Sequence, residues 1–149
     1  MIRVALWLFA FVCGVAVAED RIYLMVSDSM PKEMLLSYGR QAARSGAVLA
    51  FRGMDPDHDL VWFFREVLKP LSETGAAMVI DPRVFQSYGV TAVPTFVLAR
   101  EAPCATMEER RTQNGSPWHA CARASDQDYR KLSGAVSLDY ALRRLRGEE

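Results

Sequence analysis

The chain has 149 residues, half of them hydrophobic, and its 18 lysines and arginines are balanced by 18 aspartates and glutamates. This neutral balance argues against direct nucleic-acid binding, because such binding needs a surplus or a stripe of basic residues. The length suffices for one domain with a sizeable hydrophobic core.

The first eighteen residues have the three parts of an export signal. Arg3 supplies a positive charge, residues 4–15 form an apolar segment, and residues 16–18 read A-V-A, a cleavage site of the A-x-A type. The apolar segment is shorter than the roughly 20 residues of a membrane span, and an uncleaved anchor is the alternative. We therefore expect a signal peptide at 1–18, a single mature domain at 19–149 with no stable membrane span, and a location in the periplasm.

After residue 20 the sequence alternates between strand and helix patterns. Residues 21–26 predict a first strand, and Ser29 is a candidate N-cap for a helix that ends at Gly46. Residues 47–51 form a short apolar run, which is typical of a buried parallel strand. A second helix is predicted over residues 60–73. Its apolar residues are expected to face the core: Leu60, Phe63, Phe64, Val67, Leu68 and Leu71.

The middle of the chain continues this alternation. Residues 77–80 predict a third strand, and Asp81 is expected to cap a short helix that begins at Pro82. Residues 95–99 predict a fourth strand. The polar stretch that follows, residues 100–128, is too long for an ordinary hairpin loop and is interpreted as an insertion.

The last part of the chain supplies a possible fifth strand at 129–132 and a final helix capped by Ser137. The inward face of that helix is expected to carry Leu138, Ala141, Leu142 and Leu145. The predicted order is β-α-β-α-β-α-β-β-α. It indicates an α/β fold with a central mixed sheet of four to five strands flanked by helices.

Val93 and Pro94 stand at the start of the predicted 95–99 strand, where a cis X-Pro bond is common and the missing N–H of proline is tolerated. A V-P-T-F strand after a short helix resembles the cis-proline segment of thioredoxin-like proteins, which faces a pair of active-site cysteines. In this chain the facing segment is 29–32, and S-M-P-K replaces the C-x-P-C pattern. The resemblance therefore implies a thioredoxin-like fold that lacks the C-x-x-C redox motif.

Five sequence blocks occur in a fixed order along the chain. They are V-S-D-S-M-P at 26–31, F-R-G-M at 51–54, I-D-P-R-V-F at 80–85, V-T-A-V-P-T-F-V at 90–97 and G-A-V-S-L-D-Y-A-L at 134–142. Together they resemble the TrbC family of pilus assembly proteins from F-type conjugative transfer systems. The resemblance implies a non-enzymatic periplasmic assembly factor of a type IV secretion system, needed for conjugative pilus assembly and DNA transfer. Its expected partners are other periplasmic assembly proteins of the same system, and the sequence sets no oligomeric state.

The candidate partner-binding surface lies at the carboxyl end of the predicted sheet. Its expected residues are Ser29, Met30, Pro31, Val93 and Pro94. Thioredoxin-like proteins bind extended peptides at this place by strand addition. Arg52 follows the second strand at the same end, and a cation there can bind a partner's carboxylate. The alternatives are structural: a helix cap at Ser29, turns that only preserve the local geometry, and a solvated Arg52.

Two cysteines, Cys104 and Cys121, remain after the expected cleavage, and both lie in the 100–128 insertion. An even pair in an exported chain predicts a disulfide, worth about 3 kcal/mol in the chain-entropy model. Zinc binding with His119 is the alternative, but a fourth ligand is missing. We expect no catalytic residue, metal or cofactor. The competing functions are a thiol oxidoreductase or isomerase using these cysteines, which open no helix that would activate a thiol, and a general peptide-binding chaperone.

Overall fold

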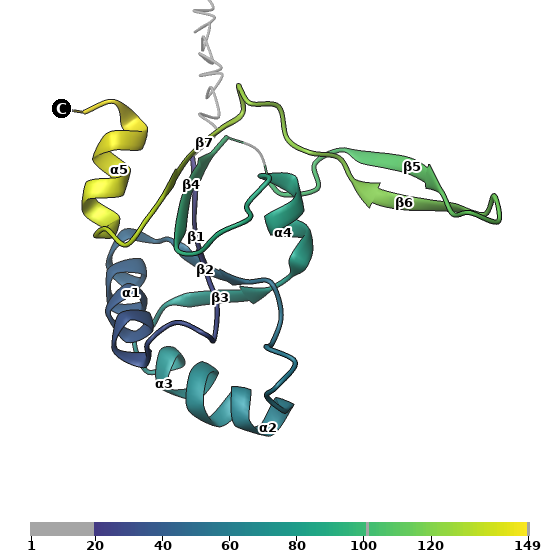
Figure 1. The fold of residues 1–149 in the computed structure, drawn as a ribbon. Helices are drawn as coiled ribbons and strands as arrows, with labels where there is room; N and C mark the ends of the chain where they lie inside the picture. The colour runs from purple at the N-terminus through teal and green to yellow at the C-terminus, as the bar shows by residue number, and fades with distance from the viewer. Residues whose placement is uncertain (1–19, 101, 149) are drawn as a thin grey trace, which may run out of the picture.

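The computed structural model describes residues 20–100 and 102–148, and Figure 1 shows their arrangement. The expected signal peptide at 1–18 lies outside the described residues. Among the residues described, no helix combines the length and the apolar character that crossing a membrane requires.

The centre of the fold is a five-stranded sheet with the order β3-β2-β1-β4-β7. Its strands are β1 (Arg21–Val26), β2 (Val48–Phe51), β3 (Ala77–Ile80), β4 (Thr95–Ala99) and β7 (Tyr129–Ser133). The first three are parallel to one another, whereas β4 is antiparallel to β1 and β7 is antiparallel to β4. This mixed sheet confirms the predicted α/β class. Because Met25 pairs with Thr95, the carboxyl end of β1 lies beside the start of β4.

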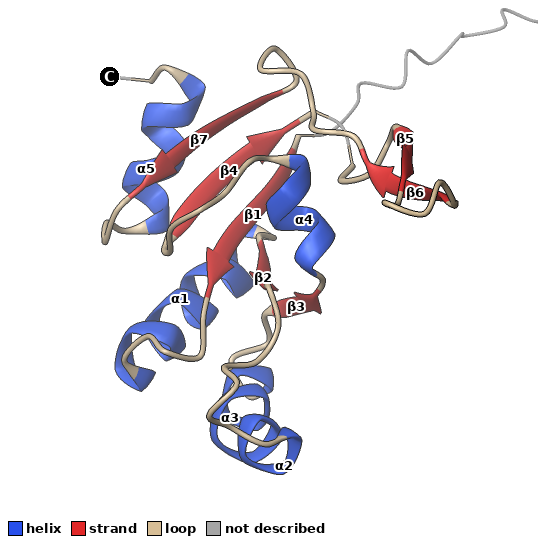
Figure 2. Ribbon diagram, turned by 45° about the vertical axis from the view of Figure 1, so that its right-hand side comes forward, coloured by secondary structure: helices blue, strands red, loops and turns tan. Residues whose placement is uncertain are grey.

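Helices pack on both faces of the sheet (Figure 2). One face is covered by α1 (Lys32–Ser45), α3 (Lys69–Ser72) and α5 (Leu138–Arg146), and the other by α4 (Pro82–Ser87). Successive strand residues point to opposite faces, so Leu24 joins the first core whereas Tyr23 and Met25 join the second. The sheet therefore has two hydrophobic cores rather than one.

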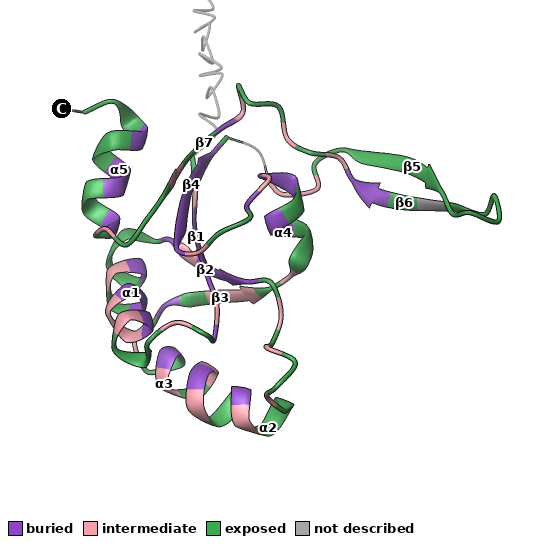
Figure 3. Ribbon diagram, in the orientation of Figure 1, coloured by how far each residue is buried: buried purple, intermediate pink, exposed green. Residues whose placement is uncertain are grey.

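Burial is greatest in the central strands, as Figure 3 shows for β1 and β4. All residues of β4 are buried, and the last four residues of β1 are buried as well. Both strands read as continuous apolar runs in the sequence because each of their faces is covered by helices. The four predicted inward residues of α5 are also buried: Leu138, Ala141, Leu142 and Leu145.

Two of the three predicted N-caps are confirmed. The Asp81 carboxylate accepts a hydrogen bond from the backbone N–H of Arg83 at 2.9 Å, and the Ser137 hydroxyl accepts one from the N–H of Tyr140 at 3.2 Å. These bonds satisfy N–H groups that have no partner inside the helix.

The predicted cap at Ser29 is wrong. Helix α1 begins at Lys32 with Pro31 at the N-cap position and no side-chain cap. The Ser29 hydroxyl lies instead 3.0 Å from that of Ser27, and the backbone N–H of Ser29 donates to the same hydroxyl at 3.2 Å. Because this local turn and Pro31 lie between Ser29 and the first helical residue, the serine is too far upstream to cap the helix.

The predicted helix over 60–73 is continuous but irregular. It consists of α2 (Leu60–Phe63), a π-helical segment η1 (Phe64–Leu68) and α3. Its buried residues are Phe63, Val67 and Leu71. Leu60 and Phe64 are 66% and 59% exposed, so their predicted place in the core is wrong. Phe63, Val67 and Leu71 form one row of side chains, or ridge, along the helix, and this ridge faces the sheet. Leu60 and Phe64 belong to the neighbouring ridge, about 100° away around the helix axis, which does not face the sheet.

The insertion contains a two-stranded antiparallel ribbon that the sequence did not predict. Strands β5 (Met107–Arg111) and β6 (Pro117–Cys121) extend away from the sheet (Figures 1 and 2). All residues of β5 are exposed, so the ribbon lacks the alternation of apolar and polar residues that marks a strand. At its base, the backbone N–H of Cys104 donates to the buried Ser87 hydroxyl of α4 at 3.1 Å.

Candidate functional site

The turn before β4 is cis at the Val93–Pro94 peptide bond, as predicted. Two contacts hold it in place. The Thr95 hydroxyl donates to the carbonyl of Ala92 at 2.7 Å, and the carbonyl of Pro94 accepts from the backbone N–H of Gly134 at 3.0 Å. Pro94 itself is buried, whereas Val93 is half-buried. The turn therefore leaves Val93 partly exposed while the proline ring is covered.

A cavity of about 170 Å³ lies beside this turn. Its lining comes from the ends of β1 and β2, from α4 and from the residues before Pro94: Val26, Ser27, Arg52, Gly53, Phe85, Thr91 and Val93. The parallel strands β1 and β2 end at the same edge of the sheet, and the start of the antiparallel β4 lies at that edge too. The structure thus brings together Arg52 and Val93, which the sequence predicted for this edge.

The Arg52 guanidinium is fixed at the wall of this cavity by two contacts. Its Nη2 donates to the carbonyl of Val90 at 2.9 Å, and its Cζ lies 5.0 Å from the centroid of the Phe85 ring. Among the described residues, no carboxylate lies within ion-pair distance of Arg52. Arg52 is therefore held in place by a carbonyl and an aromatic ring while its charge stays unneutralised.

Asp81, whose backbone N–H donates to the carbonyl of Phe51 next to Arg52, has its carboxylate engaged elsewhere. Its carboxylate accepts three hydrogen bonds from the Arg83 side chain at 2.8–3.0 Å, as well as the cap bond from the Arg83 backbone. The side-chain hydrogen bond from Arg83 is the main reason that the pKa of Asp81 lies below its usual value. Because the Asp81 carboxylate is occupied by Arg83, it does not neutralise the charge of Arg52.

A buried carboxylate missed by the sequence analysis holds the loop that carries Arg52. Asp28 is 8% exposed, and it accepts hydrogen bonds from the backbone N–H of Asp55 at 2.9 Å and from the Ser27 hydroxyl at 3.2 Å. His58 Nδ1 lies 3.5 Å from the Asp28 carboxylate, and the imidazole stacks on Trp62 with the ring centroids 3.5 Å apart. In the sequence, an aspartate between two serines gave no signal of burial, because such turns are usually solvated.

Of the predicted binding residues Ser29, Met30 and Pro31, none lines the cis-proline cavity. Ser29 and Pro31 are exposed at the turn before α1. Met30 is half-buried and lines a second cavity, of about 260 Å³, against Trp62 and Leu35. The residue of this turn that reaches the cis-proline cavity is Ser27. The turn after β1 therefore contributes residues to both cavities.

Cys104 and Cys121 form the predicted disulfide. Both sulfurs are used in this bond, so neither is a free thiolate for zinc. In the part of the chain that the structure describes, no group of three or more histidine, cysteine or acidic residues is arranged to hold a metal ion. Cys104 lines a separate cavity with Ser87 and Ala122, and none of its lining residues belongs to the cis-proline cavity.

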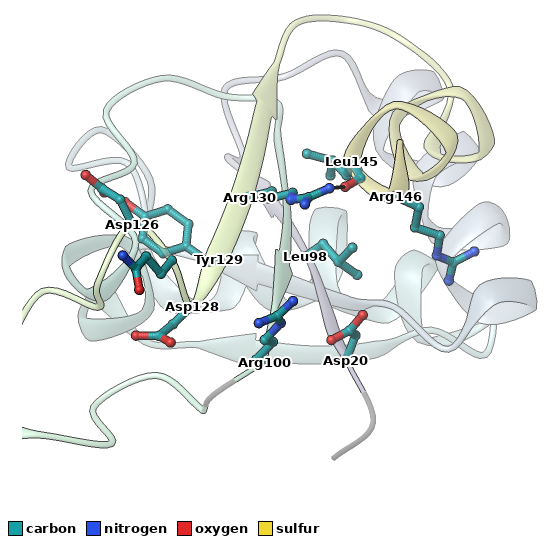
Figure 4. Close-up of a pocket in the computed structure, with 10 residues that line it drawn as sticks. Asp20, Leu98, Arg100, Asp126, Asp128, Tyr129, Arg130, Leu145 and Arg146 are labelled. Atoms are coloured by element: carbon teal, nitrogen blue, oxygen red, sulfur yellow. Dashed lines mark hydrogen bonds between the residues drawn. The ribbon is translucent and has the colours of Figure 1, made fainter. Parts of the chain in front are cut away.

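A larger cavity, of about 360 Å³, lies at the opposite edge of the sheet (Figure 4). Three arginines and three aspartates line it: Arg100, Arg130, Arg146, Asp20, Asp126 and Asp128. Arg130 points to the end of α5 and donates to the carbonyl of Leu145 at 2.9 Å. Since charges of both signs line this cavity, it has no clear preference for an anion or a cation.

The fold is a mixed α/β domain with a small cavity beside a cis-proline turn and a cation at its wall. The family model of the type-F conjugative transfer system pilin assembly protein matches residues 24–145. The chain belongs to this family, as the five sequence blocks predicted, and membership indicates a role in conjugative pilus assembly. No curated protein and no solved structure matches the chain.

Proposed function

We propose that this protein is a non-enzymatic, periplasmic, thioredoxin-like assembly factor of an F-type type IV secretion system. It serves conjugative pilus assembly and DNA transfer by binding an extended segment of another assembly protein at the cis-proline turn. Family membership supports the role in pilus assembly. The export signal in the sequence supports the periplasmic location.

The observation that carries the binding role is the unpaired backbone of Val93. Among the described residues, neither its N–H nor its carbonyl forms a hydrogen bond. Backbone groups of this kind pair with an added strand, and the neighbouring cavity can then accept a side chain of that strand. The turn is thus suited to strand addition.

The absence of a reactive group at this edge supports a non-enzymatic role. The residues at the place of the thioredoxin-like cysteines are Ser29 and Lys32. The Ser29 hydroxyl contacts Ser27 rather than a histidine, and Lys32 pairs with Glu66 at 3.2 Å. A serine nucleophile needs an adjacent base, and Ser29 has none within hydrogen-bond distance among the described residues.

The proposed function can be tested by filling the cavity. A Cβ at Gly53 would meet no heavy atom within 4 Å, so the position accepts a side chain, and Gly53→Leu adds apolar bulk at a residue that lines the cavity. In a strain lacking the gene, we expect this variant to restore far less pilus formation and conjugative transfer than the wild type. The control is Ala43→Leu, which places a leucine at an exposed position of α1 outside the cavity.

Equal protein levels and melting temperatures must accompany this comparison. Full transfer by a well-expressed Gly53→Leu protein would show that the cis-proline turn is not the contact surface. A parallel assay addresses the competing oxidoreductase function: the purified protein is expected to reduce insulin no faster than the background rate. Reduction that depends on Cys104 would support the thiol enzyme instead.

A further inference from the structure

We propose that the cis-proline cavity binds the C-terminal residue of an extended partner segment. The apolar side chain of that residue enters the cavity, and its terminal carboxylate binds Arg52. This inference rests on the proposed function, because it specifies the ligand of the same turn.

The charge of Arg52 defines the first requirement on the ligand. A guanidinium has five N–H donors, and among the described residues only one hydrogen bond, to the carbonyl of Val90, uses them. The Phe85 ring and this carbonyl hold the group in place without neutralising its charge. A cation already fixed in position loses little conformational freedom when a carboxylate binds in the matching two-pronged geometry.

The size of the cavity defines the second requirement. At about 170 Å³ it is smaller than the roughly 300–1,000 Å³ of typical small-molecule sites, so it fits one side chain rather than a cofactor. Val26, Phe85 and Val93 supply apolar walls. The occupant is therefore a single apolar side chain.

Both requirements fall on the same residue of the ligand, because Arg52 lines the cavity that receives the side chain. An internal residue of a peptide has no carboxylate beside its apolar side chain. A glutamate has a carboxylate, but it would extend its whole side chain toward Arg52 and leave the apolar walls uncovered. Only the last residue of a chain carries an apolar side chain and a carboxylate together.

Two further groups complete the site. The exposed Thr91 lines the cavity, and its hydroxyl can donate to the second carboxylate oxygen. The N–H and carbonyl of Val93 are available to pair with the backbone of the preceding ligand residues. The site thus combines strand addition with capture of a chain terminus, two modes of peptide recognition.

The test uses protein purified after expression of the full chain and the synthetic octapeptide GSTVTVTL, labelled with fluorescein at its N-terminus. Binding is measured by fluorescence anisotropy for the free acid and for the carboxamide of this peptide. We expect the free acid to bind about tenfold or more tightly than the carboxamide, because the carboxamide loses a charge-assisted hydrogen bond. Arg52→Gln should remove this difference.

Two controls separate the carboxylate effect from general charge. Arg44→Gln makes the same change of charge at an exposed position in the last turn of α1, and it should preserve the preference for the free acid. A carboxamide peptide with glutamate in place of the terminal leucine has its carboxylate on a side chain. It tests whether a side-chain carboxylate can replace the terminal one. That peptide should bind no better than the leucine carboxamide.

The possible outcomes are distinct. Equal binding of the free acid and the carboxamide would overturn this inference and leave strand addition at Val93 in place. Binding of the glutamate peptide at the level of the free acid would overturn the choice of a C-terminal residue. Failure of every peptide to bind would overturn both the inference and the proposed use of the turn. A preference for the free acid that survives in Arg52→Gln would overturn the assignment of Arg52 as the group that binds the carboxylate.

Discussion

The carboxylate of Asp28 accepts a hydrogen bond from the backbone N–H of Asp55 at 2.9 Å. This bond joins the turn after β1 to the loop between β2 and α2. The two bonded residues are 27 positions apart in the chain. The same loop begins at Arg52, directly after the last residue of β2. The geometry of the candidate site therefore depends on a buried side chain that does not line the cis-proline cavity.

Replacement of Asp28 should destabilise the protein. In Asp28→Leu, the N–H of Asp55 loses its buried acceptor, and we expect a loss of about 1–3 kcal/mol in the free energy of unfolding. Asp28→Asn keeps an acceptor oxygen and should cost less. Urea denaturation measures both changes, with Asp57→Asn at an exposed position of the same loop as the control. A Leu variant as stable as the wild type would show that the two loops are held by other contacts.

The irregular helix over 60–72 gives a prediction from two neighbouring phenylalanines. Phe63 is 0% exposed and packs edge-on against Phe51, whereas Phe64 is 59% exposed. Phe63→Ala should lower the free energy of unfolding by about 3–5 kcal/mol, because it leaves a cavity in the core. Phe64→Ala should change it by no more than about 0.5 kcal/mol. Equal losses in thermal or urea unfolding would contradict the assignment of the buried ridge.

This pair also shows where sequence periodicity stops being informative. The apolar pattern predicted the helix itself, but Leu60 and Phe64 belong to one ridge and Phe63 and Val67 to the next. Both ridges are apolar, so the pattern alone cannot say which one faces the sheet. The strands were easier to predict, because β1 and β4 are covered on both faces and read as continuous apolar runs.

The candidate site was predictable at the level of single backbone features but not of side-chain geometry. Proline after valine at the start of a strand predicted the cis bond, and the end of the second strand placed Arg52 at the same edge. The turn after β1 was less predictable, because the hydrogen bonds of Asp28 and Ser27 decide which side chains reach the cavity. Consequently, Ser27 lines the cis-proline cavity and Met30 lines its neighbour.

The disulfide should stabilise the ribbon more than the sheet. Cys104 and Cys121 close a loop that contains β5 and most of β6, and the chain-entropy model gives about 3 kcal/mol for a loop of this size. In the double variant Cys104→Ser, Cys121→Ser, we expect faster amide hydrogen exchange in β5 and β6 and unchanged exchange in β1 and β4. Mass spectrometry without reductant should detect the 104–121 crosslink in the wild type. An equal rise of exchange in β1 would mean that the ribbon and the sheet unfold together.

The cap of α4 should make stability depend on pH in the acid range. The hydrogen bonds from Arg83 hold the pKa of Asp81 below its usual value, which is about 3.9 in an unfolded chain. A carboxyl group with a lowered pKa in the folded state stabilises the protein fully above the unfolded pKa, and this contribution is lost as the pH falls through the folded pKa. At neutral pH, Asp81→Ala should therefore cost about 1 kcal/mol, as expected for the loss of an N-cap.

The difference in unfolding free energy between the wild type and Asp81→Ala should stay constant from neutral pH to about pH 5 and then shrink as the carboxylate is protonated. Arg83→Gln serves as the control, because it removes the side-chain hydrogen bonds to Asp81 but keeps the backbone cap. In that variant the loss of stability on acidification should be smaller and should be complete at a higher pH than in the wild type, since the pKa of Asp81 is less lowered. A difference between the wild type and Asp81→Ala that is the same at neutral pH and at about pH 2 would show that the charge of the carboxylate contributes nothing to the cap.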